Sequence, residues 1–395
     1  MRFLLLHPNF PGQFKHLAEA LARSGHEVKF LCQTHYNRSL PGVERLCLKG
    51  GGSHQALNQL QLDQQQRTQK LAEQYRGGME QIRSNGWTPD VVISHSGWGC
   101  GLMVKSIWPN CRQIAYLEWW FDPKSSLLSH DISNPELQLN PSLGSKFWLR
   151  NQALALELVA ADFIVAPTAW QRQQLPASLQ QRCRVIFDGI DLELFRPDPS
   201  QRAATPLLTY GTRGMEPMRA FPQFIRELPE VLKRHPTLHV DIAGSDEVNY
   251  GGQPPSQGSW GTWAQGLLKH HGIEQRVSWR GHLPLERYVT WLQSSWCHVY
   301  LTHPFVASWS LVEALACGCP LIASDVEPVR EFCGAGLAEL VDHRQPGFLQ
   351  DAVLRCLNPA TKSPALSPDL RQLMDRKQSL NFWSAVSGAD LATSD

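Results

Sequence analysis

Residues 300–331 read YLTHPFVASWSLVEALACGCPLIASDVEPVRE, and this stretch decides the fold. It begins at the end of an apolar, β-branched run, Trp296–Thr302, which predicts a strand. A helix is expected from about Ser310 to Cys317, ended by Gly318. The apolar run PLIAS at 320–324 then predicts a second buried strand. Strand, helix and strand in this order indicate an α/β sheet.

The start of this helix is a predicted phosphate site. We expect unpaired backbone N–H groups at Ser308, Trp309, Ser310 and Leu311, together with the positive end of the helix dipole. Helix ends of this kind bind phosphate. Glu313 lies in the first turn, where its carboxylate can accept hydrogen bonds from hydroxyls next to the phosphate. The alternative is that Glu313 only complements the helix dipole.

The segment SWSLVEALACGCPLIASD, residues 308–325, resembles the donor-binding signature of family 4 retaining glycosyltransferases, whose fold is GT-B. The resemblance implies that Glu313 holds the ribose of a nucleotide sugar. It also exposes a departure, because that signature usually has a second glutamate where this chain has Phe305. A glutamate contact to the donor sugar is therefore expected to be missing.

Length and composition predict two cores and exclude some partners. A chain of 395 residues is long enough for two to three domains. Because 37 Lys and Arg balance 36 Asp and Glu, we expect no nucleic acid partner and at most peripheral membrane contact. Pro8 and Asn9 end the first apolar run after six residues, which favours a first strand over a signal peptide. No window is long and apolar enough to span a membrane.

The ten cysteines are scattered without CxxC pairs, which indicates buried thiols in a reducing, cytoplasmic setting. The sequence also has no HExxH and no DxD motif, so we expect no metal requirement. No cofactor is expected beyond the donor substrate, a nucleotide sugar, most plausibly linked to UDP or GDP.

The amino-terminal segment HPNFPGQFKHLAEALARSGHEV, residues 7–28, predicts a turn and a helix that follow the strand Arg2–Leu6. It resembles the start of a bacterial subgroup of the same glycosyltransferases, in which this loop faces the cleft. Gly12 is therefore expected on the donor side, with an ordinary turn glycine as the alternative.

Two further turns of the first half follow predicted strands. In HSGWGCG, residues 95–101, the glycines do not make a dinucleotide fingerprint, but they indicate close approach of a ligand to His95 and Trp98. In LEWWFDP, Glu118 follows a strand and lies beside Trp119, where a carboxylate among aromatic rings suits sugar binding or catalysis. Glu118 stands where many relatives have a histidine that contacts the donor sugar; an ordinary loop acid is the alternative.

The second half opens with a strand and the loop GTRGMEPMRA, residues 211–220. Arg213 and Arg219 on this loop suit a diphosphate, because each guanidinium can donate two hydrogen bonds to phosphate oxygens. They resemble the family's Arg and Lys pair that holds the donor pyrophosphate; two solvated loop arginines are the alternative. The resemblance places the base at the backbone near Gly281 and His282. The Gly- and Pro-rich loop within 245–267 is expected to be functional.

Taken together, these features predict a GT-B fold with two doubly wound Rossmann-like domains facing each other across a cleft. We expect an acceptor-side domain at 1–200, a nucleotide-sugar domain at 201–360 and a segment at 361–395, with a helix that is a candidate to return to the first domain and a frayed tail. The predicted reaction is metal-independent glycosyl transfer to a glycan, lipid or small-molecule hydroxyl with retention. The alternatives are a sugar-nucleotide epimerase, a glycan phosphorylase, a non-catalytic binding protein and, less favoured, an NAD enzyme.

Overall fold

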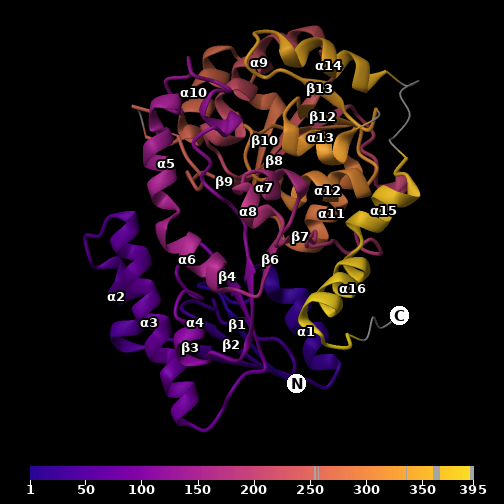
Figure 1. Cartoon of the computed structure of the whole chain (residues 1–395). Coiled ribbons are helices and arrows are strands. Elements are labelled where there is room, and N and C mark those ends of the chain that lie inside the picture. The colour runs from indigo at the N-terminus through magenta and orange to yellow at the C-terminus, as the bar shows by residue number, and fades with distance from the viewer. Residues whose placement is uncertain (253–254, 257, 335, 359–364, 392–395) are drawn as a thin grey trace. The chain divides into compact units, whose positions relative to one another are not determined.

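The computed structural model describes residues 1–252, 255–256, 258–334, 336–358 and 365–391. The chain forms two compact units, each built on its own parallel sheet (Figure 1). Unit 1 comprises Met1–Ser125, Ser142–Gly189 and Leu373–Asp395, and unit 2 comprises Ser126–Pro141 and Ile190–Gln372.

The sheet of unit 1 has seven parallel strands in the order β3-β2-β1-β4-β5-β6-β7. The strands are β1 Arg2–Leu6, β2 Glu27–Cys32, β3 Val43–Cys47, β4 Val91–His95, β5 Arg112–Tyr116, β6 Phe163–Ala166 and β7 Cys183–Val185. All five residues of β4 are buried, as expected for a strand covered by helices on both faces. The register places Leu5 beside Phe30 of β2 and Ile93 of β4, so one apolar layer runs across the sheet centre.

Helices of several lengths cover this sheet. They are α1 Lys15–Arg23, α2 His54–Asn58, α3 Gln64–Ser84, α4 Val104–Ile107, α5 Gly144–Arg150, α6 Gln152–Ala160, α7 Ala169–Gln173, α8 Ala177–Gln180 and α16 Arg376–Ser387, with the short turns η1 Gly12–Phe14 and η2 Gly50–Gly52. Asn151 separates α5 from α6, and its side chain forms hydrogen bonds with backbone groups of Phe121 and Phe147.

The sheet of unit 2 has six parallel strands in the order β10-β9-β8-β11-β12-β13. The strands are β8 Leu207–Gly214, β9 His239–Ser245, β10 Val277–Gly281, β11 Cys297–Tyr300, β12 Leu321–Ser324 and β13 Glu339–Val341. The helices are α9 Phe221–Arg234, α10 Trp260–His270, α11 Leu285–Ser294, α12 Trp309–Ala316, α13 Glu327–Cys333 and α14 Phe348–Leu357; the turns are η3 Ser126–Leu128, η5 Pro199–Gln201, η6 Pro217–Arg219 and η7 Glu274–Arg276. The turn η4 Pro141–Leu143 and α15 Pro368–Met374 lie at borders between the units.

Residues 126–141 come from the first half of the sequence but pack with unit 2, unlike the division expected at 200/201. Polar contacts explain this placement. Asp131 Oδ2 lies 3.2 Å from His303 Nε2, and Arg344 Nη1 donates to the His130 carbonyl at 2.6 Å. Such contacts between residues far apart in sequence give no local pattern that a sequence reading detects.

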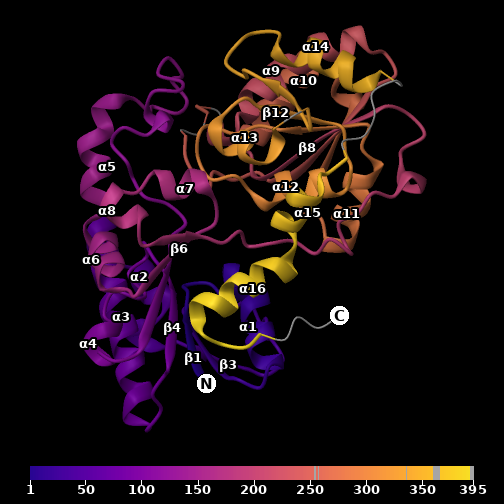
Figure 2. The same cartoon turned by 45° about the vertical axis from the view of Figure 1, so that its right-hand side comes forward.

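The C-terminal helix α16 lies beside α1 (Figure 2). Leu380, Trp383 and Val386 of α16 share a buried cluster with Leu17 and Leu21 of α1. Asp375 caps the first turn by accepting a hydrogen bond from Lys377 N at 2.9 Å. The end of the chain therefore contributes to the core of the unit that also contains its beginning. Of the tail, residues 392–395 lie outside the described part of the chain.

Candidate functional site

The predicted donor site forms at the carboxyl ends of β8 and β11 in unit 2. The Tyr300 hydroxyl at the end of β11 accepts hydrogen bonds from Ser308 N at 2.9 Å and from Arg219 Nη1 at 3.4 Å. Arg219 Nη1 also donates to Thr302 Oγ1 at 2.7 Å. Tyr300 therefore joins Arg219 to the N-terminus of α12, and the two predicted phosphate-binding elements meet.

The two arginines differ in their surroundings. β8 continues to Gly214, because Gly214 pairs with Ser245 after a shift in register. Arg213 is thus an exposed strand residue and not a loop residue as expected. Arg219 lies in η6 and is only 6% exposed. Burial lowers the pKa of Arg219, but the neighbouring Tyr300, Tyr250 and Glu216 raise it more, so the guanidinium stays charged.

An aromatic pair lies against both arginines. The Tyr250 ring centroid is 5.0 Å from Arg219 Cζ and 5.9 Å from Arg213 Cζ. Phe305, which stands where the family signature has a glutamate, lies 5.7 Å from Tyr250 between ring centroids. The face of an aromatic ring attracts a cation, but unlike a carboxylate it carries no net negative charge that would compete with an anionic ligand. The exposed Arg213 therefore keeps its positive charge available to a ligand, whereas Arg219 is buried and donates to Tyr300 and Thr302.

The loop that carries Tyr250 is held by Glu216, which is fully buried. Glu216 Oε2 accepts hydrogen bonds from the backbone N of Asn249 and Tyr250, both at 2.7 Å, and of Gly251 at 3.3 Å. These charge-assisted bonds fix the position of the Tyr250 ring. Residues 253, 254 and 257 of this loop lie outside the described residues.

Glu313 is half-buried and lies in α12 beyond its first turn, so the expectation of a first-turn acid is wrong because the helix begins at Trp309. Tyr288 of α11 donates a hydrogen bond from its hydroxyl to Glu313 Oε2 at 3.0 Å. Burial raises the pKa of Glu313 to about 7, although the Tyr288 bond lowers it. Since one carboxylate oxygen is held by Tyr288, the carboxyl group has a defined orientation from which to contact a ligand hydroxyl.

The backbone donors at the start of α12 are fewer than expected. Ser308 N donates to Tyr300, and Leu311 N donates to the Ser308 carbonyl at 3.1 Å. The expectation of unpaired N–H groups at these two positions is therefore wrong, because a tyrosine hydroxyl and the first helical turn take them up. The Ser308 and Ser310 hydroxyls lie 2.6 Å apart, and the Trp309 side chain is 40% exposed. Gly281 and His282, the predicted base contacts, are both exposed where β10 ends.

In unit 1, candidate residues gather at the carboxyl ends of β1, β4 and β5, which are neighbours in the sheet. The rings of His7 and His95 lie 4.6 Å apart, and His95 Nε2 lies 3.3 Å from Glu118 Oε2. His7 Nδ1 accepts from Asn9 N at 2.9 Å, so its Nε2 carries the proton and donates to Gln13 Oε1 at 2.8 Å. Burial, with the nearby His95, lowers the pKa of His7 well below its usual range, so His7 is neutral.

Three glycines of unit 1 lie where a side chain would collide with the protein itself. A Cβ at Gly12 would lie 2.6 Å from the His7 ring, one at Gly99 would lie 2.5 Å from the Thr68 carbonyl of α3, and one at Gly101 would lie 2.2 Å from Glu157 Oε1. The expectation that the glycines of 95–101 allow a ligand to approach is therefore wrong for Gly99 and Gly101. Trp98 is 50% exposed, and Trp119 is buried.

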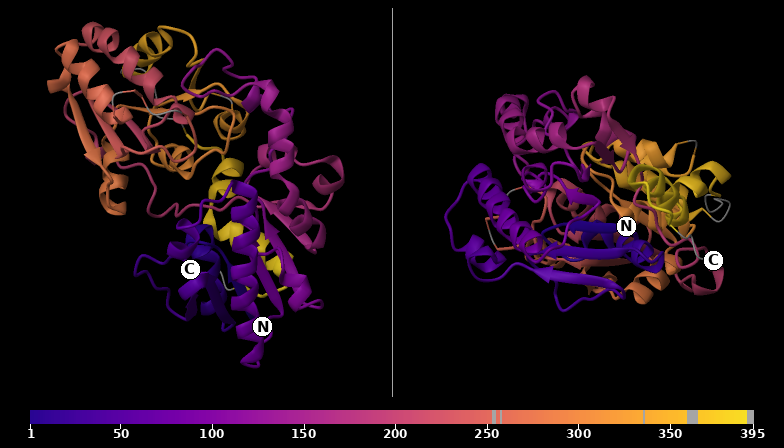
Figure 3. Two further views of the ribbon diagram at one scale, coloured as in Figure 1. Left: turned by 90° about the vertical axis from the view of Figure 1, so that its left-hand side faces the viewer. Right: turned by 60° about the horizontal axis from the view of Figure 1, so that its bottom comes forward.

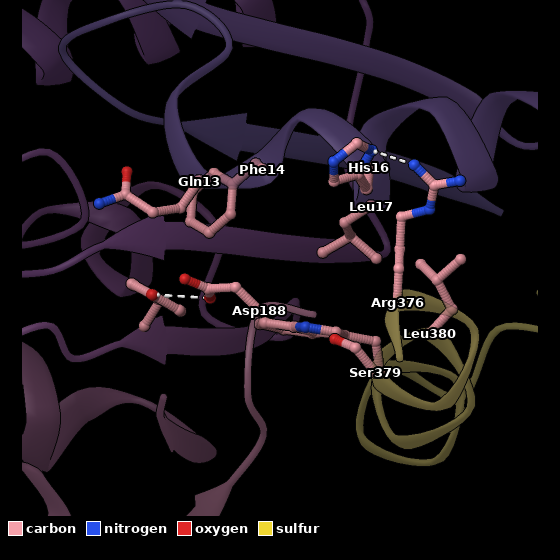
Figure 4. A pocket seen from close by; sticks show the side chains of 10 residues that line it. Gln13, Phe14, His16, Leu17, Asp188, Arg376, Ser379 and Leu380 are labelled. Carbon is pink, nitrogen blue, oxygen red and sulfur yellow. Dashed lines mark hydrogen bonds between the residues drawn. The ribbon is translucent and has the colours of Figure 1, made fainter. Parts of the chain in front are cut away.

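A narrow pocket of unit 1 opens between η1, α1, the end of β5 and α16, as Figure 4 shows. It combines an Asp188 carboxylate, which accepts from the Tyr116 hydroxyl at 2.8 Å, with the Arg376 guanidinium, which lies 3.4 Å from His16 Nδ1. The ten lining residues are Gln13, Phe14, His16, Leu17, Tyr116, Asp188, Arg376, Ser379, Leu380 and Trp383. Burial and the nearby cations Arg376 and Lys15 lower the pKa of His16 to about 4. The pocket offers both hydrogen-bond donors and acceptors.

Comparison with known families identifies both halves of the chain. Residues 24–195 match the model of the glycosyl transferase family 4 group, and residues 207–365 match that of the glycosyl transferases group 1. Each half of the chain is thus similar to a glycosyltransferase family. Among curated relatives, the D-inositol 3-phosphate glycosyltransferase of Frankia alni is 28% identical over 189 residues, which are 45% of this chain and 44% of that protein. The corresponding protein of Acidothermus cellulolyticus is 24% identical over 217 residues, which are 52% of this chain and 48% of the relative. The chain spans about half the length of the curated relatives it matches.

Solved structures confirm the GT-B fold expected from the sequence. Sucrose-phosphate synthase from Thermosynechococcus elongatus matches with a TM-score of 0.68 at 18% identity, over 98% of this chain and 96% of that one. Anabaena Alr3699/HepE in complex with UDP matches with a TM-score of 0.67 at 14% identity, over 98% and 99%. Within the described part of the chain, none of the helices combines the length and the apolar character that a membrane span requires. The same residues contain no group of three or more His, Cys, Asp or Glu side chains arranged to hold a metal ion.

The structure adds residues that the sequence reading missed. In unit 2 these are Tyr300, Tyr288, Glu216 and Tyr250, and in unit 1 they are His7, Gln13, Asp188 and Arg376. Tyr300 carried the clearest signal, since it is the last residue of a buried strand just before the helix signature. The position of Arg376 carried none, because it depends on the fold of the last helix.

Proposed function

We propose that this glycosyltransferase transfers a sugar from a UDP-sugar to an acceptor hydroxyl with retention of the anomeric configuration and without a metal ion. The observation that carries the proposal is the contact chain from Arg219 through Tyr300 to Ser308. It brings a charged guanidinium and the positive end of α12 to one place, next to the exposed Arg213. Phosphate groups are the ligands such an arrangement favours.

UDP is the proposed nucleotide because structural neighbours bind it. The Alr3699/HepE structures contain UDP, UDP with glucose, and UDP-glucose, and a further neighbour, TarM of S. aureus, also contains UDP. Glu313, oriented by Tyr288, would accept hydrogen bonds from the ribose hydroxyls. The backbone at Gly281 and His282 would contact the base, while GDP is the second nucleotide to test.

In the proposed reaction, the bond between the anomeric carbon and the β-phosphate oxygen breaks and the acceptor oxygen bonds to that carbon. Arg213, Arg219 and the start of α12 would stabilise the charge that develops on the leaving diphosphate, which is the role a metal ion plays elsewhere. The acceptor hydroxyl would attack from the face that the diphosphate leaves and give its proton to a phosphate oxygen. No protein nucleophile takes part in this scheme.

The proposed acceptor side lies in unit 1. Glu118, whose Oε2 lies 3.3 Å from His95 Nε2, would bind hydroxyls of the acceptor by hydrogen bonds, with the exposed Trp98, close in sequence to His95, as an apolar contact. The ten cysteines among the described residues carry free thiols, which supports a cytoplasmic location for the enzyme. The acceptor itself is a glycan, a lipid or a small molecule.

Calorimetry with UDP, GDP and ADP, followed by turnover of the matching glucose conjugates, tests the proposal. We expect UDP to bind at micromolar affinity, Glu313→Ala to weaken it at least about tenfold, and Glu230→Ala, an exposed acid on α9, to leave it unchanged. Turnover should survive chelation of metal ions, and NMR of the product should show the anomeric configuration of the donor. Absence of binding to all three nucleotides, or an inverted product, would contradict the proposal.

A further inference from the structure

The outer side of α5 and α6 carries apolar side chains that unit 1 leaves uncovered. On α6, Leu156 and Val159 are 65% and 64% exposed, while Leu154 and Leu158 on the inner side are buried. On α5, Trp148 and Leu149 are 50% and 56% exposed. Single exposed apolar residues are ordinary on protein surfaces, whereas four on two consecutive helices form a patch that needs an explanation.

The patch is a continuous stripe. Asn151, the residue between the helices, has helical dihedral angles of φ −82° and ψ −2°, so the chain keeps turning in the same sense from α5 into α6. Steps of four and three residues lead from Trp148 through Gln152 and Leu156 to Val159, and such steps keep side chains on one side of a helix. Figure 3 shows the two helices following each other along one line.

Cations frame this stripe. Lys146 and Arg150 are exposed on α5, and the Arg150 guanidinium lies 3.9 Å from the Phe121 ring centroid, which holds it in place. At the other end, Arg182 donates to the carbonyl of Val159 at 3.4 Å. Between residues 144 and 160 the single acid is Glu157, and it is only 1% exposed.

We infer that this surface docks on membranes that contain anionic lipids. We name it the α5–α6 surface, and it comprises Lys146, Trp148, Leu149, Arg150, Leu156, Val159 and Arg182. Helices with an apolar stripe, a tryptophan and flanking cations lie in the plane of the lipid headgroups, with the apolar side chains below them. Anionic headgroups attract the cations. Docking on such a membrane would therefore involve both the apolar side chains and the cations of this surface.

A second copy of the chain fits this surface less well. In a twofold contact of two stripes packed antiparallel, the Arg182 end of one copy meets the Lys146 and Arg150 end of the other. Cation then faces cation in a contact that excludes water, which opposes association. The proposal does not depend on the transferase reaction, since it concerns docking alone.

Co-sedimentation of the full chain with vesicles tests the proposal. Vesicles of phosphatidylcholine with phosphatidylglycerol are compared with vesicles of phosphatidylcholine alone, at low and high salt. The double variant Leu149→Gln/Leu156→Gln should partition at least about tenfold more weakly, because two apolar side chains are lost from the lipid contact. Leu354→Gln, an equally exposed leucine (59%) on α14 of unit 2, is the matched control and should bind like the wild type.

A separate variant tests how much the positive charge contributes to vesicle binding. Lys146→Gln should weaken partition about fivefold on anionic vesicles and leave binding to phosphatidylcholine unchanged. Circular dichroism and light scattering accompany each variant. The proposal is overturned if the wild type binds anionic vesicles no better than neutral ones, if the folded double variant binds as the wild type does, or if the double variant converts a dimer into a monomer. That last result would assign the stripe to a second copy.

Discussion

Replacing Arg213 by glutamine separates phosphate binding from fold stability. Arg213 is exposed, and its guanidinium carbon lies 5.9 Å from the centroid of the Tyr250 ring. A cation and a ring at an exposed site stabilise by about 0.5–1 kcal/mol at most. We therefore expect Arg213→Gln to change the free energy of unfolding by less than about 1 kcal/mol. Arg219 is a poorer probe, because its loss would also leave Thr302 Oγ1 without a buried donor.

The effect of Arg213→Gln on ligand binding should be much larger. A hydrogen bond to a charged group contributes about 1.5–3 kcal/mol, so losing the guanidinium should weaken UDP binding about 10- to 150-fold. Uridine has no phosphate, and its weaker binding should stay the same within about twofold, since Arg213 contributes nothing to it. Titration calorimetry with UDP, UMP and uridine measures this difference, and rising salt should reduce it.

The control is Arg371→Gln, which removes an equally exposed arginine from α15. It keeps the net charge of the two variants equal, so that any general electrostatic effect cancels. If Arg213→Gln binds UDP as the wild type does, or if it weakens uridine as much as UDP, Arg213 does not contact the diphosphate. The proposed leaving-group stabilisation would then rest on Arg219 and α12 alone.

Three further predictions concern the frame around the sites. Gly99→Ala should lower the free energy of unfolding in urea by about 2–5 kcal/mol, because its Cβ would lie 2.5 Å from the Thr68 carbonyl. Gly97→Ala has a similar φ but open space around its Cβ and should lower it by about 1 kcal/mol. Equal losses would refute the packing argument. Burial raises the pKa of Glu157 from 4.5 to about 7, so the folded state binds more protons than the unfolded state between these pH values. The free energy of unfolding should therefore fall by about 3 kcal/mol from pH 4.5 to 7, relative to Glu157→Gln. Parallel pH profiles of the two proteins would contradict this. Burial, with the neighbouring His303 and Arg344, lowers the pKa of His130 from 6.5 to about 4. The unfolded state then binds more protons than the folded state, so unit 2 should lose stability as the pH falls from 6.5 to 4, and should lose less in His130→Gln. Thermal melts at several pH values measure the effects at both residues.

Local patterns predicted the two sheets and the strands and helix of the signature segment well. The strand, helix and strand of 296–324 appear as β11, α12 and β12, because apolar β-branched runs and a terminal glycine are local signals. Contacts between distant residues were not predictable. The bond from Tyr288 to Glu313 joins two helices, and the pairing of Gly214 with Ser245 moves Arg213 into a strand. The glycines of 95–101 show why residue type alone does not predict a ligand site. A glycine is needed where another part of the protein packs against the backbone, and equally where a ligand does.

Phe305, in place of the signature glutamate, suits its neighbours in unit 2. A carboxylate at that position would lie near Tyr250, and thus near two guanidinium groups that lie 5.0 and 5.9 Å from that ring. Such a carboxylate would attract the arginines and compete with a diphosphate for them unless the donor sugar occupied it. The Phe305 and Tyr250 rings remove this competition, and Glu216 holds Tyr250 in place from the buried side through three backbone donors. A chain with this aromatic pair is therefore expected to recognise the sugar mainly through contacts other than a carboxylate at position 305.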